Sequence, residues 1–305
     1  MIAMERGDEM REHYISSLGQ YLESIEKLKS YYPAEVFLNN PTANQFVYRG
    51  LCDQAYTLLP GIFRQQTDTV DGHAITNDTY LAWAKEKDLL KSFMHEASGT
   101  LKIPTDDLLH WAEYAQHYGV PTRFMDWSSN PLAALYFACR DKITTDGTVW
   151  LLHGTNYKRF LGRYIKEENG NKKIQEIIGE IIKGASNIEY PVLYTPYYVD
   201  ARMSAQGSYF MVWGTLCQPL ERMLSADNLQ MNLPETDDGS RTYGKEQEDG
   251  LLFRFNIYAD RKQPLLHELD TVGINEKTLF PGLDGIGRYV ERKYRFDYNE
   301  TICSF

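Results

Sequence analysis

Cysteine is scarce in this chain, and its spacing excludes the common small zinc modules. Four cysteines occur among 305 residues, at positions 52, 139, 217 and 303, and no two are closer than 78 residues. Zinc ribbons and fingers need ligand pairs about two to four residues apart. Widely spaced cysteines of this kind indicate a protein of a reducing compartment.

Long apolar stretches are also lacking. The longest apolar run, residues 132–139, is far shorter than the roughly 20 residues that span a bilayer. The first residues carry charge from Glu5 onward and contain no apolar signal core. We therefore expect a cytoplasmic protein that does not associate with membranes.

Basic residues are in the minority. The chain has 32 Lys and Arg against 42 Asp and Glu, which gives a net charge of −10. A protein with this balance repels polyanions as a whole, so we expect no bulk nucleic-acid partner, although a local basic patch is compatible with it. Hydrophobic residues at 43% and charged residues at 24% exclude wholesale disorder.

Three widespread catalytic motifs are missing. The sequence contains no Gly-x-Gly-x-x-Gly, no P-loop Gly-Lys-Ser/Thr and no Gly-x-Ser-x-Gly. Dehydrogenase, P-loop NTPase and α/β-hydrolase functions therefore lose their usual sequence support.

The pattern that is present predicts an α+β fold with a mixed sheet flanked by helices. Helices and strands are interspersed without strict alternation, which argues against a doubly wound sheet. We expect an N-terminal helical segment over residues 1–34 and one domain over 35–300, with an insertion at about 155–190. Helices are predicted over 11–30, 79–95, 106–118, 131–140, 173–183, 260–270 and 285–294, and strands over 46–48, 147–152, 192–194, 208–213 and 251–257.

Two helix boundaries have clear local signals. Gly119 is placed to take the left-handed C-cap of the preceding helix, and Pro121 prevents its continuation. Asn130 and Pro131 are suited to the N-cap and the first position of the next helix. That helix is apolar almost all round, which predicts burial.

An isoleucine stripe marks the insertion. The spacing of these side chains places them on one face of a helix over 173–183. Such a stripe is most often core; if it is exposed, it predicts a homo-oligomer or partner interface. The stripe consists of Ile174, Ile177, Ile178, Ile181 and Ile182.

Three segments carry more specific motifs. Residues 46–50 read Phe-Val-Tyr-Arg-Gly, 58–64 read Leu-Leu-Pro-Gly-Ile-Phe-Arg, and 111–138 contain Gln-His-Tyr-Gly, Met-Asp-Trp and Ala-Leu-Tyr-Phe-Ala. Together they resemble the FRG domain, a largely prokaryotic family named for a Phe-Arg-Gly motif, with tyrosine here in place of phenylalanine. The resemblance is close over 44–152 and weaker over 200–285, where 201–210 and 279–285 carry it. It implies a cytoplasmic protein of a family often linked with defence or stress, but no settled reaction.

Arg49 is the first candidate site residue. At the end of a predicted strand, an arginine can hold a phosphate or carboxylate with two parallel hydrogen bonds. Alternatively, it pairs with an internal carboxylate and Gly50 serves a turn. The sequence leaves both interpretations open.

A second candidate group lies between two predicted helices. Free N–H groups at a helix N-terminus bind anions, which makes Ser128 a candidate ligand-binding residue. Arg123 and Asp126 either join it in a cleft or form a structural ion pair. We expect a cleft where the 46–49 strand meets the 123–130 turn, lined by Arg49, His117, Arg123 and Asp126.

One helix face carries His110, Glu113 and His117, at i, i+3 and i+7. A metal would need a further ligand, and the sequence supplies none nearby, so no metal site is predicted. His117 is either a polar group of the cleft or a core histidine bonded to a carbonyl.

The order of three elements resembles ADP-ribosyltransferases of the arginine–serine–glutamate type. Tyr48-Arg49-Gly50, Ser128-Ser129 and Glu246-Gln247-Glu248 follow that order. The analogy implies NAD as cofactor, Arg49 at its phosphate, Ser128 at the nicotinamide ribose, and Glu248 stabilising an oxocarbenium-like transition state. About six acid-x-acid triplets are expected by chance at this composition, so a solvated acidic loop over 234–250 is the alternative.

Two functions from different classes follow. The first is an enzyme acting on a nucleotide-like substrate, with NAD-dependent ADP-ribosyl transfer as its most concrete form. The second is a non-catalytic binding or sensing module for a phosphate-bearing ligand or a protein partner.

Overall fold

The computed structural model describes residues 13–31, 46–64, 66–70, 73–77, 85–104, 106–169, 173–196, 200–224 and 251–302. Seven strands form one sheet in the order β1-β9-β6-β2-β5-β8-β7, and a separate hairpin consists of β3 (Gln66–Val70) and β4 (His73–Asn77). All neighbours in the sheet are antiparallel except the parallel pair β1 and β9. The seven strands are β1 (His13–Ile15), β2 (Phe46–Leu51), β5 (Phe124–Ser128), β6 (Gly147–His153), β7 (Val192–Tyr194), β8 (Ser208–Val212) and β9 (Leu252–Ile257).

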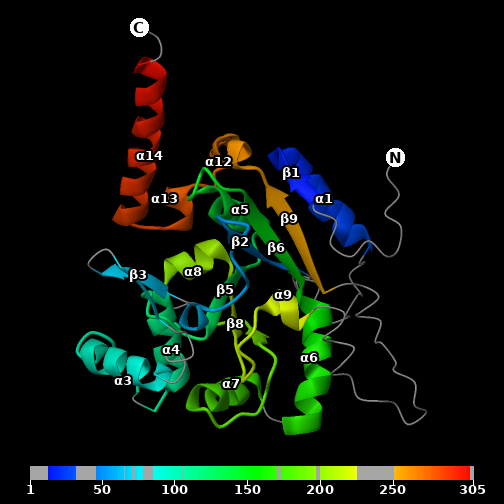
Figure 1. Ribbon diagram of the computed structural model, residues 1–305, viewed down its shortest axis with the longest axis vertical. Helices are drawn as coiled ribbons and strands as arrows, with labels where there is room; N and C mark the ends of the chain where they lie inside the picture. Colours follow the sequence, from blue (N-terminus) through cyan, green and yellow to red (C-terminus); the bar gives the residue numbers. More distant parts are fainter. Residues whose placement is uncertain are drawn as a thin grey trace.

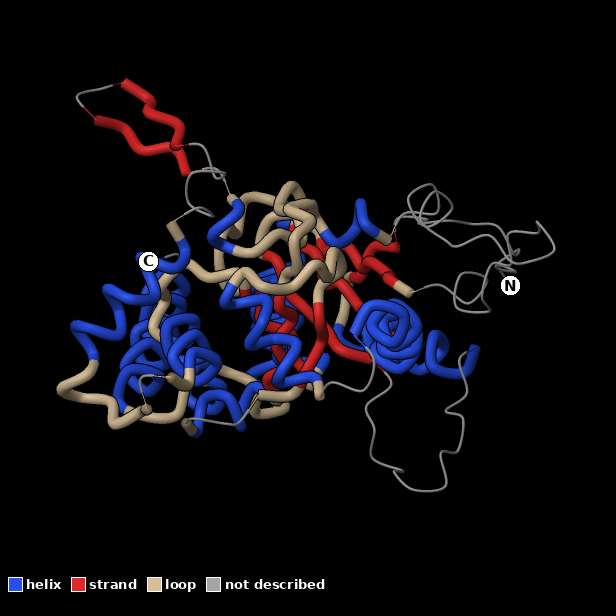
Figure 2. Tube along the Cα trace, turned by 90° about the horizontal axis from the view of Figure 1, so that it is seen from below, coloured by secondary structure: helices blue, strands red, loops and turns tan. Residues whose placement is uncertain are grey.

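Helices cover both faces of the sheet, which confirms the predicted α+β class (Figures 1 and 2). The core of one face contains side chains of α3 (Glu86–Ala97), α4 (Leu108–His117), α6 (Gly154–Asn169) and α7 (Ile174–Lys183). The core of the other face contains side chains of α1 (Leu18–Tyr31), α5 (Pro131–Cys139) and α12 (Lys262–Thr271). We call these the α4 face and the α5 face. The remaining helical elements are η1 (Gly61–Phe63), α8 (Ala201–Gln206), α9 (Leu220–Met223), η2 (Ala259–Arg261), α13 (Glu276–Leu279) and α14 (Leu283–Ile302).

Alternation along β2 decides which side chains enter which core. Val47 and Leu51 pack into the α4 face, whereas Phe46 and Tyr48 pack into the α5 face. Successive side chains of a strand point to opposite sides of a sheet. Arg49 therefore stands on the α4 face, between Val47 and Leu51.

The predicted caps are confirmed. Gly119 follows α4 with φ of +80°, in the left-handed region that favours glycine. The Asn130 Oδ1 accepts hydrogen bonds from the backbone N–H of Leu132 at 3.0 Å and of Ala133 at 3.4 Å, and Pro131 is the first residue of α5. These short-range signals fix both ends of the segment that contains β5.

Two of the predicted boundaries were wrong, and one helix was missed. Residues 13–15 of the predicted 11–30 helix form β1, which lies at the edge of the described sheet and pairs with β9, and α1 begins only at Leu18. The strand predicted over 46–48 continues to Leu51, so Arg49 and Gly50 lie inside it. Helix α6 was missed, and the helix predicted over 79–95 is described from Glu86 as α3, because 78–84 lie outside the described residues.

The isoleucine stripe belongs to the core of the α4 face. Ile177, Ile178, Ile181 and Ile182 are buried in this core, and Ile174 alone of the stripe is exposed, at 39%. Gly184 ends α7 in the left-handed conformation, with φ of +69°. The buried isoleucines are therefore not available as a partner surface in this structure.

Candidate functional site

Arg49 lies where two central strands separate. β2 pairs with β6 along its whole length, and Arg49 is opposite Trp150. With β5, on its other side, β2 pairs at Tyr48 and Ser128 alone. Beyond that pair, the Nη1 of Arg49 donates to the backbone oxygen of Asp126. The guanidinium thus bridges the gap between two strands that no longer share a ladder.

Three buried N–H groups near this gap have no hydrogen-bond partner in the described part of the chain. They are the Nε of Arg49 and the indole Nε1 groups of Trp127 and Trp150. Trp150 is the cross-strand neighbour of Arg49, and Trp127, one residue before the Tyr48 partner Ser128, shares its face by strand alternation. Both tryptophans are buried. Buried donors without acceptors are uncommon and mark places where water, an ion or a ligand supplies the acceptor.

A second arginine adds positive charge at the same place. The Nε of Arg64 donates to the backbone oxygen of Leu59 at 2.7 Å, and its side chain is exposed. Burial lowers the pKa of Arg49 to about 10; the Asp126 carboxylate opposes this shift and the Arg64 charge adds to it. Arg49 therefore remains cationic at neutral pH. Two guanidinium groups around one carboxylate leave the site with excess positive charge.

The Asp126 side chain is held by hydrogen bonds from α4. Gln116 Nε2 donates to Asp126 Oδ2 at 2.8 Å, and the Thr122 hydroxyl donates to Gln116 Oε1. This chain of bonds holds the Asp126 carboxylate in place, close enough to Arg49 for its charge to act on the Arg49 pKa. Gln116 and Arg64 were not singled out among the predicted site residues, although both lie within the motif segments.

Arg123 does not join the site. Its guanidinium forms a buried ion pair with Glu86 of α3, in which Nε lies 2.8 Å from Oε2, and its Nη1 donates to the backbone oxygen of Trp213. Arg123 directly precedes β5 and is 5% exposed. The sequence offered Asp126 as the ion-pair alternative; the partner is Glu86, which is 37 residues upstream.

His117 contacts a carboxylate outside the predicted cleft residues. Its Nε2 lies 2.6 Å from Oδ2 of Asp200, and the histidine side chain is 12% exposed. Asp200 also caps α8 by accepting from the backbone N–H of Met203. His117 therefore links the end of α4 to the start of α8, and this contact does not involve Asp126 or Arg49.

Ser128 ends β5 and is tied to the backbone. Its Oγ donates to the backbone oxygen of Gln206 and accepts from the backbone N–H of Asn130 at 2.9 Å. The sequence put this serine at a helix start, whereas it is the last strand residue, paired with Tyr48. Its hydroxyl fastens β5 to α8. Glu248, the predicted catalytic residue, lies outside the described residues.

The three polar residues on one face of α4 contact three different partners. His110 contacts Asp107, Glu113 contacts Tyr194, and His117 contacts Asp200. Within the described ranges, no group of three His, Cys, Asp or Glu side chains is arranged to hold a metal ion.

Glu113 should make stability depend on pH. Burial raises its pKa above the usual 4.5, partly offset by the hydrogen bond from Tyr194 Oη at 2.8 Å. A carboxyl with a raised folded-state pKa favours the fold below 4.5 and loses that contribution as the pH rises through its folded pKa. We expect Glu113→Gln to gain stability relative to the wild type between pH 4.5 and 8, in urea unfolding across that range. A difference that stays constant with pH would contradict it.

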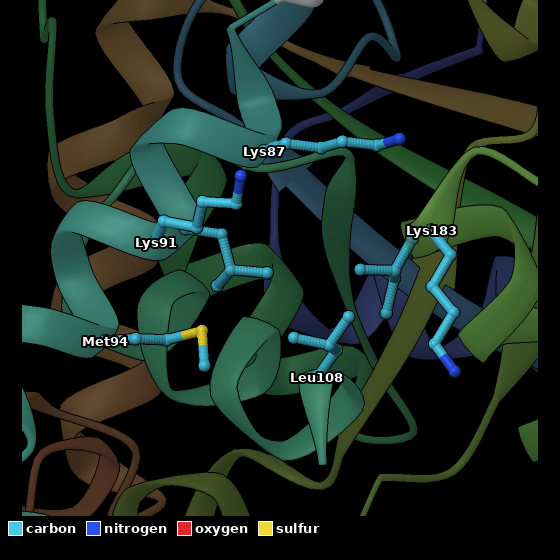
Figure 3. Close-up of a pocket in the computed structure, with 7 residues that line it drawn as sticks. Lys87, Lys91, Met94, Leu108 and Lys183 are labelled. Carbon is cyan, nitrogen blue, oxygen red and sulfur yellow. The ribbon is translucent and has the colours of Figure 1, made fainter. Parts of the chain in front are cut away.

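A cavity of about 200 Å³ lies elsewhere, between α3, α4 and α7 (Figure 3). Its walls are mainly apolar, and Lys87, Lys91 and Lys183 stand around it. None of the predicted site residues lines it. The lining residues are Lys87, Leu90, Lys91, Met94, Leu108, Ile182 and Lys183.

Comparison with known families identifies the segment that contains the site. Residues 44–147 match the family model of the FRG domain, so the chain carries an FRG domain there. The matched segment includes Arg49, Arg64, Gln116 and Asp126, and it ends at the first residue of β6. No curated protein and no solved structure matches the chain. Among the described helices, none combines the length and apolar character needed to cross a bilayer.

Proposed function

We propose that the FRG domain of this protein recognises a phosphate-bearing, nucleotide-like ligand at Arg49. The observation that carries the proposal is the row of buried, unpartnered N–H donors of Trp127, Arg49 and Trp150. Phosphate oxygens are strong acceptors, and a guanidinium group binds them in pairs. Arg64 adds a second positive charge, and the indole rings offer apolar surface to a base or a nicotinamide.

The catalytic form of the proposal is NAD-dependent ADP-ribosyl transfer. In that reaction the bond from ribose C1′ to the nicotinamide nitrogen breaks and neutral nicotinamide leaves. An acceptor nucleophile then forms a bond to C1′ and gives up a proton. Arg49 would hold the diphosphate, and the pairing of Tyr48 with Ser128 supports a serine beside the arginine-bearing strand. Glu248 enters this form from the sequence alone.

One observation favours the alternative, a binding or sensing module. The Asp126 carboxylate is engaged by Gln116, and the Ser128 hydroxyl is engaged by backbone groups. Of the described site residues, neither is thus left free for proton transfer. A site of this kind binds an anion without a built-in acid–base pair.

The test is Arg49→Lys, which keeps the charge and loses the planar pair of donors. We expect the Kd of the bound nucleotide to rise about tenfold or more, while the melting temperature without ligand barely changes. Differential scanning with NAD, ADP-ribose, ATP and GTP identifies the ligand, because a ligand at a hundredfold its Kd adds about 2.7 kcal/mol of stability. Titration of both proteins then gives the Kd ratio.

Arg261→Lys is the matched control, since Arg261 also donates to a backbone carbonyl, that of Ser16, at 3.1 Å. Its Kd should equal that of the wild type. The proposal is wrong if no nucleotide stabilises the wild type. It is also wrong if Arg49→Lys destabilises the protein while the fraction that stays folded binds the nucleotide with the wild-type Kd. Release of nicotinamide from NAD by the wild type separates the transferase from the binding module.

A further inference from the structure

Three arginines from distant parts of the chain meet at one aromatic ring. The guanidinium carbon lies 4.9 Å from the Phe280 ring centroid for Arg202, 5.4 Å for Arg288 and 5.6 Å for Arg140. Arg202 belongs to α8, Arg288 to α14, and Arg140 is the C-cap of α5. We call this group the Phe280 arginine cluster.

The ring itself is fixed by the surrounding core. Phe280 is 6% exposed and lies against Tyr136 and Phe137 of α5. Gln206, at the end of α8, donates to the backbone oxygen of Leu279 at 2.9 Å. The two weaker motif segments of the sequence, 201–210 and 279–285, are thus in direct contact.

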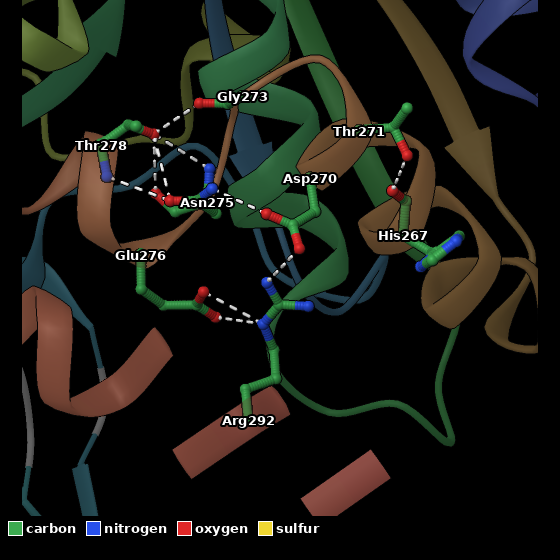
Figure 4. A network of polar contacts seen from close by, with 8 residues as sticks. All are labelled: His267, Asp270, Thr271, Gly273, Asn275, Glu276, Thr278 and Arg292. Carbon is green, nitrogen blue, oxygen red and sulfur yellow. Dashed lines mark hydrogen bonds and ion pairs between the residues drawn. The ribbon is translucent and has the colours of Figure 1, made fainter. Parts of the chain in front are cut away.

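Helix α14 is held so that Arg288 reaches the same ring. Arg292, one turn further along, binds Glu276 of α13, with Nε 2.8 Å from Oε1, and lies 3.7 Å from Asp270 of α12 (Figure 4). At Gly285 the helix backbone comes so close to α13 that an added Cβ would lie 1.9 Å from the Phe280 oxygen. The orientation of α14, and with it the position of Arg288, is built into the fold.

The positive charge of the cluster is only partly neutralised. Arg140 Nε donates to Asp141 at 2.7 Å. Arg202 and Arg288 form no ion pair with an acidic side chain in the described ranges. The ring attracts each guanidinium group but cancels no charge. In a protein of net charge −10, this is a local concentration of positive charge.

We propose that the Phe280 arginine cluster is a binding site for a ligand with several linked phosphate groups. Each guanidinium fork can bind one phosphate through two hydrogen bonds. The three forks surround a ring rather than a single point, so linked phosphates suit them better than one phosphate. The ring is buried and covered by arginines, so recognition falls on the phosphate chain and not on a stacked base.

This site is separate from the one at Arg49 and does not depend on the function proposed there. Phe280 packs in the core of the α5 face, whereas Arg49 stands on the α4 face. The two sites can therefore be inactivated one at a time.

The test is isothermal titration of the whole chain with inorganic tripolyphosphate. We expect saturable binding, with a Kd raised roughly tenfold or more by Arg202→Gln and by Arg288→Gln, because each removes a charge-assisted hydrogen-bonding group. Lys293→Gln is the matched control: it removes one positive charge from the exposed surface of the same helix. Its Kd should stay within about twofold of the wild type.

Further ligands separate the possible sources of the phosphate chain. If ATP binds as tightly as tripolyphosphate and loses affinity in the same variants, the ligand is the triphosphate group of a nucleotide. If tripolyphosphate binds and ATP does not, the ligand is a free polyphosphate. Arg288 is exposed, so its variant should keep the wild-type melting temperature and report on binding alone. Absence of tripolyphosphate binding, equal affinity for orthophosphate, or an equal loss in Lys293→Gln would each overturn the proposal.

Discussion

Arg123→Ala is expected to lower the free energy of unfolding by about 3–5 kcal/mol, because it strands the Glu86 carboxylate in the core. The pair is well buried, with 6% of the arginine side chain and 11% of the glutamate side chain exposed. Arg123 also donates to the backbone oxygen of Trp213 at 3.2 Å, and that bond is lost as well. Urea unfolding gives the difference, and ligand titration of the folded fraction should return the wild-type Kd.

A double substitution separates the ion pair from the space that it fills. Arg123→Met with Glu86→Leu removes both charges and keeps apolar volume, so it should recover most of the lost stability. Glu86→Gln alone should be destabilised like Arg123→Ala. Two results would contradict this structural role and support a role of Arg123 in ligand binding. The first is a loss of unfolding free energy below about 1 kcal/mol in Arg123→Ala, and the second is a higher ligand Kd in the double variant.

The position of Arg123 outside the predicted cleft shows that the sequence did not reveal which acidic residue each arginine contacts. Arg123 and Asp126 are three residues apart, and their proximity in the sequence suggested a shared cleft. Their partners are set by the tertiary structure: Asp126 meets Arg49 on β2, whereas Arg123 meets Glu86 on α3. Which of several acids an arginine reaches depends on packing between elements, and spacing along one chain does not contain that information.

Local signals, by contrast, were sufficient for much of the fold. Gly119, Asn130 and Pro131 act within a few residues, so the ends of α4 and α5 could be read directly. The strand β1 has three residues and exists through its pairing with β9, more than 200 residues away. Such a strand has too few residues for a periodic pattern.

The sequence indicated only some of the groups that lie around Arg49. Arg49 and Asp126 lie in motif segments and are in contact. The sequence predicted Trp150 to lie in a strand. Its position beside Arg49, with an unpartnered indole N–H, follows from the register of β2 with β6, which the sequence did not reveal. Ser128 was a candidate because it stands just before a predicted helix. Its hydroxyl is instead hydrogen-bonded to the backbone of Asn130, the N-cap of α5, and of Gln206 in α8.

The glycine of the Tyr-Arg-Gly motif has a packing explanation. Gly50 lies inside β2 and is not among the described glycines with positive φ, so it does not serve a turn. A Cβ at this position would lie 1.9 Å from the backbone oxygen of Ala134 and 2.7 Å from the backbone nitrogen of Ala138. Both atoms belong to α5, which rests directly on the strand.

Gly50→Ala is therefore expected to cost about 3 kcal/mol of stability or more, because the clash is with backbone atoms of a buried helix and no side chain can move aside. Gly162→Ala, in the middle of α6, is the matched control: an added Cβ there meets nothing within 4 Å. The helix should gain about 0.5–1 kcal/mol from that change. Urea unfolding of both variants measures the contrast. A Gly50→Ala protein as stable as the wild type would show that α5 can lift from β2. If the expected loss of stability is found, the role of Gly50 is to let α5 pack against β2. Arg49 is then the residue of the Tyr-Arg-Gly motif that recognises the ligand.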